Sequence, residues 1–253
     1  MSKLTDKLLQ EQKKYPTVVV DNFFKNPDII REFGLSLEYE VAEDGRWPGE
    51  RSVFLHEVNQ LLYHFMIRKI LSVYFDLHNV EVKWDDIQMM FQKVKKFDDL
   101  KDTVKNKGWM HIDEEQTFAG IIFLTPNIDK DCGTSIYRLK DEHKDFVMSD
   151  YMPTAKKAFY SKNNIDLDEY EKEYNKLHEK FEPITIVKNI YNRLIMFDSK
   201  EYHAANQYFT DGDERLTFVF FFKNVQCNKK PLDVLHESDT DIENEIIKIK
   251  NGQ

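Results

Sequence analysis

The sequence has few cysteines, no surplus of positive charge and no long apolar run, and each shortage excludes a class of protein. Cys132 and Cys227 are the two cysteines among 253 residues. Two are too few for a disulfide framework or a zinc knuckle, so we expect a reducing, cytoplasmic compartment. The formal net charge is −9, which argues against strong binding to the phosphate backbone of nucleic acids.

Membrane and targeting signals are also missing from the sequence. No run of about 18 apolar residues occurs, so we expect no membrane-spanning helix and no membrane partner. The first 16 residues are charged and lack the apolar stretch of a secretory signal peptide.

What is present is the composition of a globular protein with an aromatic interior. Hydrophobic residues make up 41% of the chain and aromatic residues 13%, with 19 phenylalanines. A chain of this length and composition can bury a substantial core. The expected elements are helices first and then many short strands, without repeats. This order predicts an α+β, mainly β fold whose β part is a sandwich or jelly roll.

We expect a single domain over residues 1–253. A strand and supporting helices occupy residues 1–85, and residues 226–253 form a peripheral tail. The core spans residues 86–225 and is interrupted by an insertion at about 138–182. Helices are predicted at residues 3–14, 27–37 and 58–75 from caps and apolar periodicity. Strands are predicted at residues 17–20, 87–97, 118–124, 133–137, 184–187, 193–197 and 215–222.

The insertion is rich in charge and tyrosine. Asp166 and Glu169 form a plausible capping pair, and apolar residues then recur at helical spacing through residues 167–181. We therefore predict one surface helix, together with a loop of about 25 residues that acts as a lid.

Three residues could form a metal site. His111 and Asp113 are two apart, so on a strand their side chains point to the same face. With His203 they would make the 2-His-1-carboxylate triad that suits non-haem Fe(II). The alternative is that His203 is an ordinary core or surface histidine. A second His-x-Asp pair, His143 and Asp145, lies in a solvated charge run, and we interpret it as chance.

Arg215 opens the last strong strand, where it shares a face with Thr217. If that face is interior, the buried guanidinium needs an anionic partner. Arginine can grip a carboxylate with two hydrogen bonds, and Thr217 would add a hydroxyl donor. The alternative is a salt bridge to an internal Asp or Glu. Two interpretations of the Trp47–Ser52 segment also remain. In one, Trp47 is a buried ring that braces a loop; in the other, the loop borders a pocket and Arg51 faces a substrate.

Taken together, these segments resemble the Fe(II)/2-oxoglutarate-dependent oxygenases, above all a small branch found in phages and bacteria. Prolyl 4-hydroxylase-like enzymes are more distant relatives. The likeness spans most of residues 17–225 and rests on the following motifs: Trp47-Pro48-Gly49-x-Arg51-Ser52, His111-x-Asp113, Ala119-Gly120-x-x-Phe123-Leu124-Thr125-Pro126-Asn127, Asn192-Arg193-Leu194-x-x-Phe197-Asp198-Ser199 and Arg215-Leu216-Thr217.

The resemblance implies a double-stranded β-helix, that is, a jelly-roll core. It implies that Fe(II) is held by His111, Asp113 and His203, and that Arg215, helped by Thr217, binds the far carboxylate of 2-oxoglutarate. The implied reaction uses O2 to hydroxylate a C–H bond of an unidentified substrate, a peptide or protein side chain or a small metabolite, releasing succinate and CO2. Candidates for contacting the metal-proximal end of 2-oxoglutarate are Gln88, Tyr137 and Asn206.

Two other functions remain open at this point. One is a cupin-type jelly-roll metal enzyme that does not use 2-oxoglutarate. The other is a non-catalytic jelly-roll interaction protein. Arg215 separates the first of these from a 2-oxoglutarate enzyme, because only the latter needs a cation for a dicarboxylate.

Overall fold

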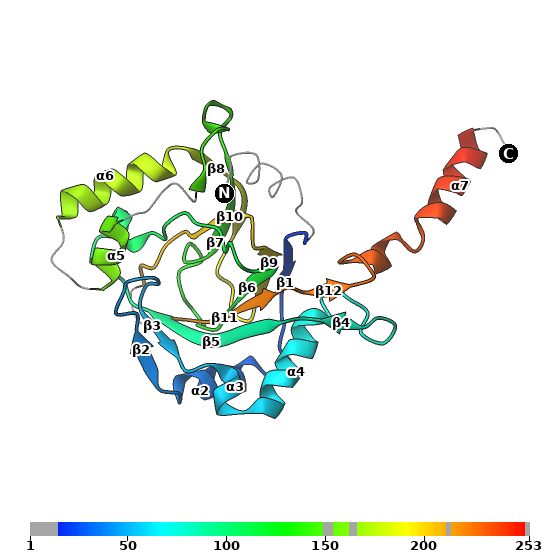
Figure 1. Ribbon diagram of the computed structural model, residues 1–253, viewed down its shortest axis with the longest axis horizontal. Coiled ribbons are helices and arrows are strands. Elements are labelled where there is room, and N and C mark those ends of the chain that lie inside the picture. Colours follow the sequence, from blue (N-terminus) through cyan, green and yellow to red (C-terminus); the bar gives the residue numbers. More distant parts are fainter. Residues whose placement is uncertain (1–14, 149–153, 162–165, 211–213, 251–253) are drawn as a thin grey trace.

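Two antiparallel sheets form the body of the protein (Figure 1). The computed structural model describes residues 15–148, 154–161, 166–210 and 214–250. The larger sheet has seven strands in the order β1 (Val18–Val20), β9 (Leu194–Asp198), β6 (Phe118–Phe123), β11 (Arg215–Lys223), β5 (Asp86–Val94), β3 (Glu50–Ser52) and β2 (Tyr39–Val41). The smaller sheet has three, in the order β10 (Tyr202–Ala205), β7 (Thr134–Leu139) and β8 (Phe181–Val187).

The two faces of β11 have different neighbours because side chains alternate along a strand. Leu216, Phe218, Phe220 and Phe222 belong to the main hydrophobic core. That core also contains residues of α4 (Gln60–Leu71), and Figure 1 shows α2 (Pro27–Leu35), α3 (Leu55–Val58) and α4 on this side of the sheet. The alternate residues of β11, beginning with Arg215, point to the opposite face of the sheet.

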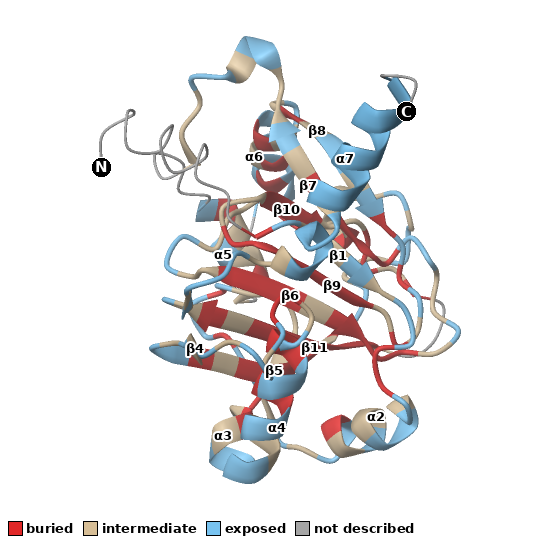
Figure 2. Ribbon diagram, turned by 90° about the vertical axis from the view of Figure 1, so that its right-hand side faces the viewer, coloured by how far each residue is buried: buried red, intermediate tan, exposed pale blue. Residues whose placement is uncertain are grey.

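A second apolar cluster joins the two sheets on that other side. It contains Ala119 and Phe197 from the larger sheet and Ile136 and Val187 from the smaller one. Figure 2 shows buried residues along β6, β9 and β11 of the larger sheet. The apolar cluster therefore fills part of the space between the two sheets, and residues of both sheets also line the cavity described below.

The insertion packs on the core through aromatic residues. It includes α5 (Thr154–Tyr160) and α6 (Leu167–His178), and Asp166 caps α6 by accepting hydrogen bonds from the backbone of Asp168 and Glu169. Tyr170, Tyr174 and Leu177 of α6 are buried. The Trp109 indole donates a 2.9 Å hydrogen bond to the Tyr170 hydroxyl, so α6 is tied directly to the segment that carries His111.

The α+β, mainly β class is confirmed, and each predicted strand has a counterpart in the structure. The predicted helix at 58–75 is instead α3 and α4, because Asn59 is extended and its side chain caps α4 at the amide of Leu62. The helix predicted at 3–14 lies outside the described residues. Two helices were not predicted: α5, and α7 (Asp239–Lys250) in the tail, which extends away from the sheets (Figure 1).

The remaining elements are short. The ribbon of β4 (Val82–Lys83) and β12 (Gln226–Cys227) lies beside the larger sheet. Single 3-10 turns occur at η1 (Val104–Asn106), η2 (Asp141–His143) and η4 (Asp233–His236). Among the described residues, no helix combines the length and the hydropathy needed to span a bilayer.

We predict that Phe218→Ala destabilises the fold by about 3–5 kcal/mol, because it removes a fully buried ring from a packed core. The Phe218 ring packs edge to face on Phe91, with the two centroids 4.9 Å apart. Phe65→Ala, at a residue that is 60% exposed on α4, should change stability by less than about 0.5 kcal/mol. Urea unfolding followed by circular dichroism measures both, and equal changes would contradict the assigned core.

Candidate metal centre

A pair of backbone hydrogen bonds brings His111 and His203 together. The His111 amide donates to the carbonyl oxygen of His203 at 3.1 Å, and the His203 amide donates back to the carbonyl of His111 at 3.0 Å. Residues paired in this way across antiparallel strands carry their side chains on the same face. The two imidazole rings accordingly lie with centroids 4.1 Å apart.

Both imidazole rings are oriented by the backbone. Nδ1 of His111 lies 2.8 Å from the carbonyl oxygen of Trp109, and Nδ1 of His203 lies 2.9 Å from that of Glu201. A carbonyl oxygen can only accept, so each Nδ1 must be the protonated, donating nitrogen. Each Nε2 is then left with a free lone pair, which is the state a metal ligand requires.

Asp113 supplies the carboxylate. Its amide donates to the carbonyl oxygen of Ser199 at 2.9 Å, a separate contact outside the register of the isolated His111–His203 bridge. Its Oδ2 lies 3.6 Å from Nε2 of His203, and among the described residues it is buried without a hydrogen-bond donor. Burial raises the pKa of Asp113 and lowers the pKa of His111 well below its usual value. A divalent cation bound here would offset the cost of burying an ionised Asp113, and it would further favour the neutral form of His111 that a metal ligand requires.

These three side chains fit a metal ion. Each offers one ligand atom, and the three atoms lie within 4.8 Å of one another. In the part of the chain that the structure describes, no other group of three histidine, cysteine or carboxylate side chains meets that condition. The orphaned Oδ2 of Asp113 and the two free Nε2 atoms form the mixed nitrogen and oxygen donor set that suits Fe(II).

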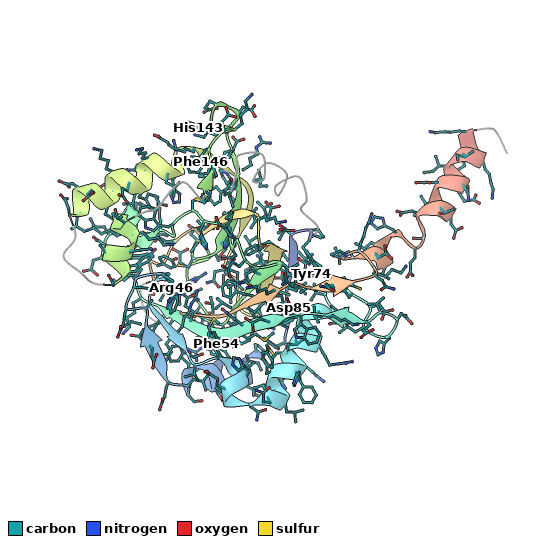
Figure 3. All side chains as sticks on the ribbon, in the orientation of Figure 1. Arg46, Phe54, Tyr74, Asp85, His143 and Phe146 are labelled. Atoms are coloured by element: carbon teal, nitrogen blue, oxygen red, sulfur yellow. The ribbon has the colours of Figure 1, made fainter. Side chains whose placement is uncertain are left out.

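The triad opens into a cavity of about 260 Å³ between the two sheets. Its walls include apolar residues from both sheets and cationic side chains from the elements around them. Among the described residues, the lining contains one carboxylate, that of Asp113, and four cations: Arg46, Arg51, Lys156 and Arg215. Figure 3 shows Arg46 on the side of the molecule near α5.

Arg215 is 3% exposed and has no anionic partner among the described residues. Its Nε donates to the carbonyl oxygen of Cys132 at 2.9 Å, but its Nη2 is buried without an acceptor. Burial lowers the pKa of Arg215, and a buried guanidinium is costly unless an anion compensates it. The expected alternative, a salt bridge to an internal carboxylate, does not occur in the described part of the chain.

The other residues expected to contact a co-substrate lie elsewhere. Thr217 is fully buried and outside the cavity lining, with its hydroxyl 3.5 Å from the carbonyl oxygen of Gln92. Gln88, Tyr137 and Asn206 do not line the cavity either. The Nε2 of Gln88 points to Asp86 instead.

A different threonine, Thr134, supplies a hydroxyl to the cavity lining. It comes from β7, its hydroxyl is buried without a partner, and it lines the cavity with Arg215. Lys156 and Tyr160 of α5 also line the cavity. Sequence reasoning missed all three residues, because no local pattern connects a strand of the second sheet or a helix of the insertion with the His-x-Asp segment.

His178 holds the metal-binding segment from the side of the insertion. Its Nε2 lies 3.1 Å from the backbone amide of Met110, which donates to it, and its ring stacks on Tyr174 with centroids 3.8 Å apart. Burial lowers the pKa of His178 to about 3. The histidine is therefore neutral at neutral pH and acts as an acceptor that fixes the residue next to His111.

A family model described as "Family of unknown function (DUF6445)" matches residues 4–214. The chain belongs to this family. The match covers every residue of the triad and stops just before Arg215. No curated protein is significantly similar to this DUF6445 member.

Solved structures similar to this DUF6445 protein include members of the 2-oxoglutarate and Fe(II) oxygenase family. HygX from Streptomyces hygroscopicus, with nickel and 2-oxoglutarate bound, is 11% identical with a TM-score of 0.46 over 87% of each chain. A Trichoplax adhaerens prolyl hydroxylase with a hypoxia inducible factor peptide is 12% identical, with a TM-score of 0.46 over 88% of this chain and 90% of that one. A Pseudomonas putida prolyl-4-hydroxylase is 12% identical, with a TM-score of 0.43 over 88% and 98%. At these TM-scores, any assignment of function rests on the cavity itself.

We predict that His178→Gln reduces the acid sensitivity of the fold. Unfolded histidine has a pKa of about 6.5, so between about pH 6.5 and pH 3 the unfolded state binds the proton and stability falls as the pH falls. Glutamine can still accept from Met110 but does not titrate. Between pH 7 and pH 5 the variant should lose about 1–2 kcal/mol less stability than the wild type. Urea unfolding at the two pH values measures this, and an identical loss in both proteins would contradict it.

Proposed function

We propose that this protein is an Fe(II)- and 2-oxoglutarate-dependent dioxygenase that hydroxylates a C–H bond of its substrate and releases succinate and CO2. One observation carries the proposal: two oriented imidazoles and one carboxylate converge in a cavity that also contains a buried arginine with no anionic partner among the described residues. The triad suits Fe(II) with open coordination positions. The arginine suits a dicarboxylate.

His111, Asp113 and His203 would hold the metal. When bound, iron and 2-oxoglutarate would together supply the activation of O2. The carbonyl oxygens of Trp109 and Glu201 keep both Nε2 atoms directed at the metal position by holding the Nδ1 protons. The backbone pairing of His111 with His203 fixes the distance between the two rings before any metal binds.

Arg215 would bind the far carboxylate of 2-oxoglutarate, with Thr134 as the neighbouring hydroxyl donor. Both side chains have buried donor atoms without acceptors in the same cavity. An ionised carboxylate would satisfy both donors and compensate the buried charge. The need of these two side chains for an anionic acceptor favours a 2-oxoglutarate enzyme. A cupin-type enzyme that does not bind 2-oxoglutarate does not require a cation at that position.

The walls of the cavity would exclude water from the reaction. Trp109, Phe197, Val219 and Phe221 line it with apolar surface, and a dry site strengthens electrostatic contacts inside it. We assign the two facing antiparallel sheets to a double-stranded β-helix, with residues 86–225 as the core of one oxygenase domain. The insertion that closes one side remains our candidate for a lid.

The metal site can be tested by anaerobic titration with Fe(II) and 2-oxoglutarate. We expect a weak visible charge-transfer band in the wild type and none in His111→Ala, because one of three ligands is lost. His143→Ala is the matched control, since His143 belongs to the other His-x-Asp pair and lies well away from Arg46 (Figure 3). This control should give the wild-type band.

A folded wild-type protein without the band would contradict the proposal and would favour a non-catalytic interaction protein. A band that is equally strong in His111→Ala would contradict the choice of ligands. Succinate release from candidate substrates, with His111→Ala as the blank, then measures the reaction itself.

The role of Arg215 has a separate test. Arg215→Gln should raise the 2-oxoglutarate concentration needed for half of the band by about 30-fold or more, because a buried charge-assisted contact is lost, at a cost of about 2 kcal/mol or more. The band should return at high 2-oxoglutarate, which shows that the variant folds. Arg138→Gln, at a solvent-exposed ion pair with Glu182, is the control. An unchanged requirement in Arg215→Gln would favour a cupin-type enzyme.

A further inference from the structure

Three cations in the cavity lining have no role in the proposed function so far: Arg46, Arg51 and Lys156. Arg46 is exposed and already forms an ion pair with Asp44, so two remain to be explained. Arg51 comes from β3 and Lys156 from α5. The turn before β3 packs on α5, because a side chain at Gly45 would collide with the backbone carbonyl of Lys157. The two elements that carry these cations therefore meet beside the cavity.

Aromatic rings hold Arg51 in place, and no carboxylate among the described residues forms an ion pair with it. Its guanidinium lies over the Trp47 ring, 4.4 Å from the centroid, and 5.7 Å from that of Phe221. Its Nε is buried and has no acceptor among the described residues. Burial lowers the pKa of Arg51 to about 10, which leaves it charged at neutral pH. Trp47 adds a second buried donor without an acceptor, its Nε1.

Gly49 allows the loop between Trp47 and Arg51 to bring both side chains to the cavity. Gly49 has a φ of +70°, and a Cβ there would collide with the carbonyl oxygen of Lys93 on β5. Only glycine fits such a turn against a neighbouring strand. The backbone between Trp47 and Arg51 is thus built to bring both side chains over β5, and Gln92 of β5 closes the loop by donating to the carbonyl of Pro48 at 2.8 Å.

Lys156 is the second uncompensated cation. It lines the cavity, whereas its neighbour Lys157 is exposed. Within the described part of the chain, no carboxylate forms an ion pair with Lys156. Burial lowers the pKa of Lys156 to about 8; Asp113 raises it, and Arg51 lowers it further. The ammonium of Lys156 thus faces another cation, and the carboxylate that acts on it among the described residues is that of Asp113, a proposed metal ligand.

The charges assigned so far balance without these two residues. A divalent metal with Asp113 leaves one positive charge, and Arg215 adds another. The two carboxylates of 2-oxoglutarate neutralise both. Arg51 and Lys156 then remain as two positive charges in the cavity lining beside the proposed metal position, where uncompensated charge is costly.

Building on the proposed function, we propose that the substrate is a small acid whose oxyanion, a carboxylate or a phosphate, binds between Arg51 and Lys156 with Trp47 Nε1 as an additional donor. The oxyanion would compensate both cations and give acceptors to Arg51 Nε and Trp47 Nε1. A cavity of about 260 Å³ that also holds 2-oxoglutarate leaves room for only a small reacting molecule. Arg51 and Lys156 are thus specificity-determining residues that place the substrate beside the metal.

The test is calorimetric titration at pH 7 of the protein loaded with Ni(II), which does not turn over, and a slight excess of 2-oxoglutarate. Two probes, inorganic phosphate and acetate, distinguish the two oxyanions, with trimethyl phosphate and acetamide as their neutral counterparts. At least one anion should bind and its neutral counterpart should not. Its Kd should rise at least tenfold in Arg51→Gln and in Lys156→Gln, as expected for loss of one charged contact.

Two variants provide controls. Lys157→Gln removes the same charge one residue away on the exposed side of α5, and it should change Kd by less than twofold. Arg51→Lys retains the positive charge and should restore part of the affinity. Circular dichroism and Ni(II) binding by each variant establish that it folds.

Three results would overturn the substrate assignment while leaving the proposed function intact. The first is that neither anion binds to protein that does bind Ni(II) and 2-oxoglutarate. The second is an equal loss of anion affinity in Lys156→Gln and Lys157→Gln. The third is a tenfold loss of 2-oxoglutarate affinity in Arg51→Gln, which would assign Arg51 to the co-substrate. A wild-type protein that binds neither Ni(II) nor 2-oxoglutarate would instead overturn the proposed function.

Discussion

The paired backbone hydrogen bonds between His111 and His203 are the constraint on which the rest of the site depends. They join two segments that are far apart along the chain and direct both imidazoles to one face. A second, separate backbone contact, from the Asp113 amide to the carbonyl of Ser199, holds the segment that carries the carboxylate. The three candidate ligand atoms converge through these contacts, and each ring is then oriented by a carbonyl two residues before it.

The electrostatics of the cavity oppose those of the whole chain. The protein carries a formal net charge of −9, yet four cations and one carboxylate of the described residues line the cavity. Exposed charge is screened by water and salt, whereas buried charge is screened much less. The cavity lining is therefore positive although the molecule as a whole is negative, and the proposed acidic ligands rest on this contrast. Its buried donors without acceptors are the strongest indication that the site is built around something the chain itself does not supply.

The insertion is part of the site as well as a covering for it. Tyr170 fixes Trp109 from one side and His178 fixes Met110, so α6 determines where the His111 segment lies. Through Lys156 and Tyr160, α5 contributes directly to the cavity wall. Changes to α6 would therefore affect the proposed metal position, because its two contacts reach Trp109 and Met110, which lie within two residues of His111.

The sequence by itself determined the features that depend on short spacing. The two-residue step from His111 to Asp113 and the alternation along β11 follow from strand geometry, and they give the triad segment and the interior position of Arg215. Only the tertiary structure decided which residues surround them. The alternation of side chains along β11 predicts which face of the sheet carries Thr217, but it does not predict that Thr217 lies outside the cavity. No local sequence pattern links Thr134 or Lys156 to the triad. Those contacts exist because two sheets and an inserted helix close around one space, and side chains from distant parts of a chain meet only when it folds.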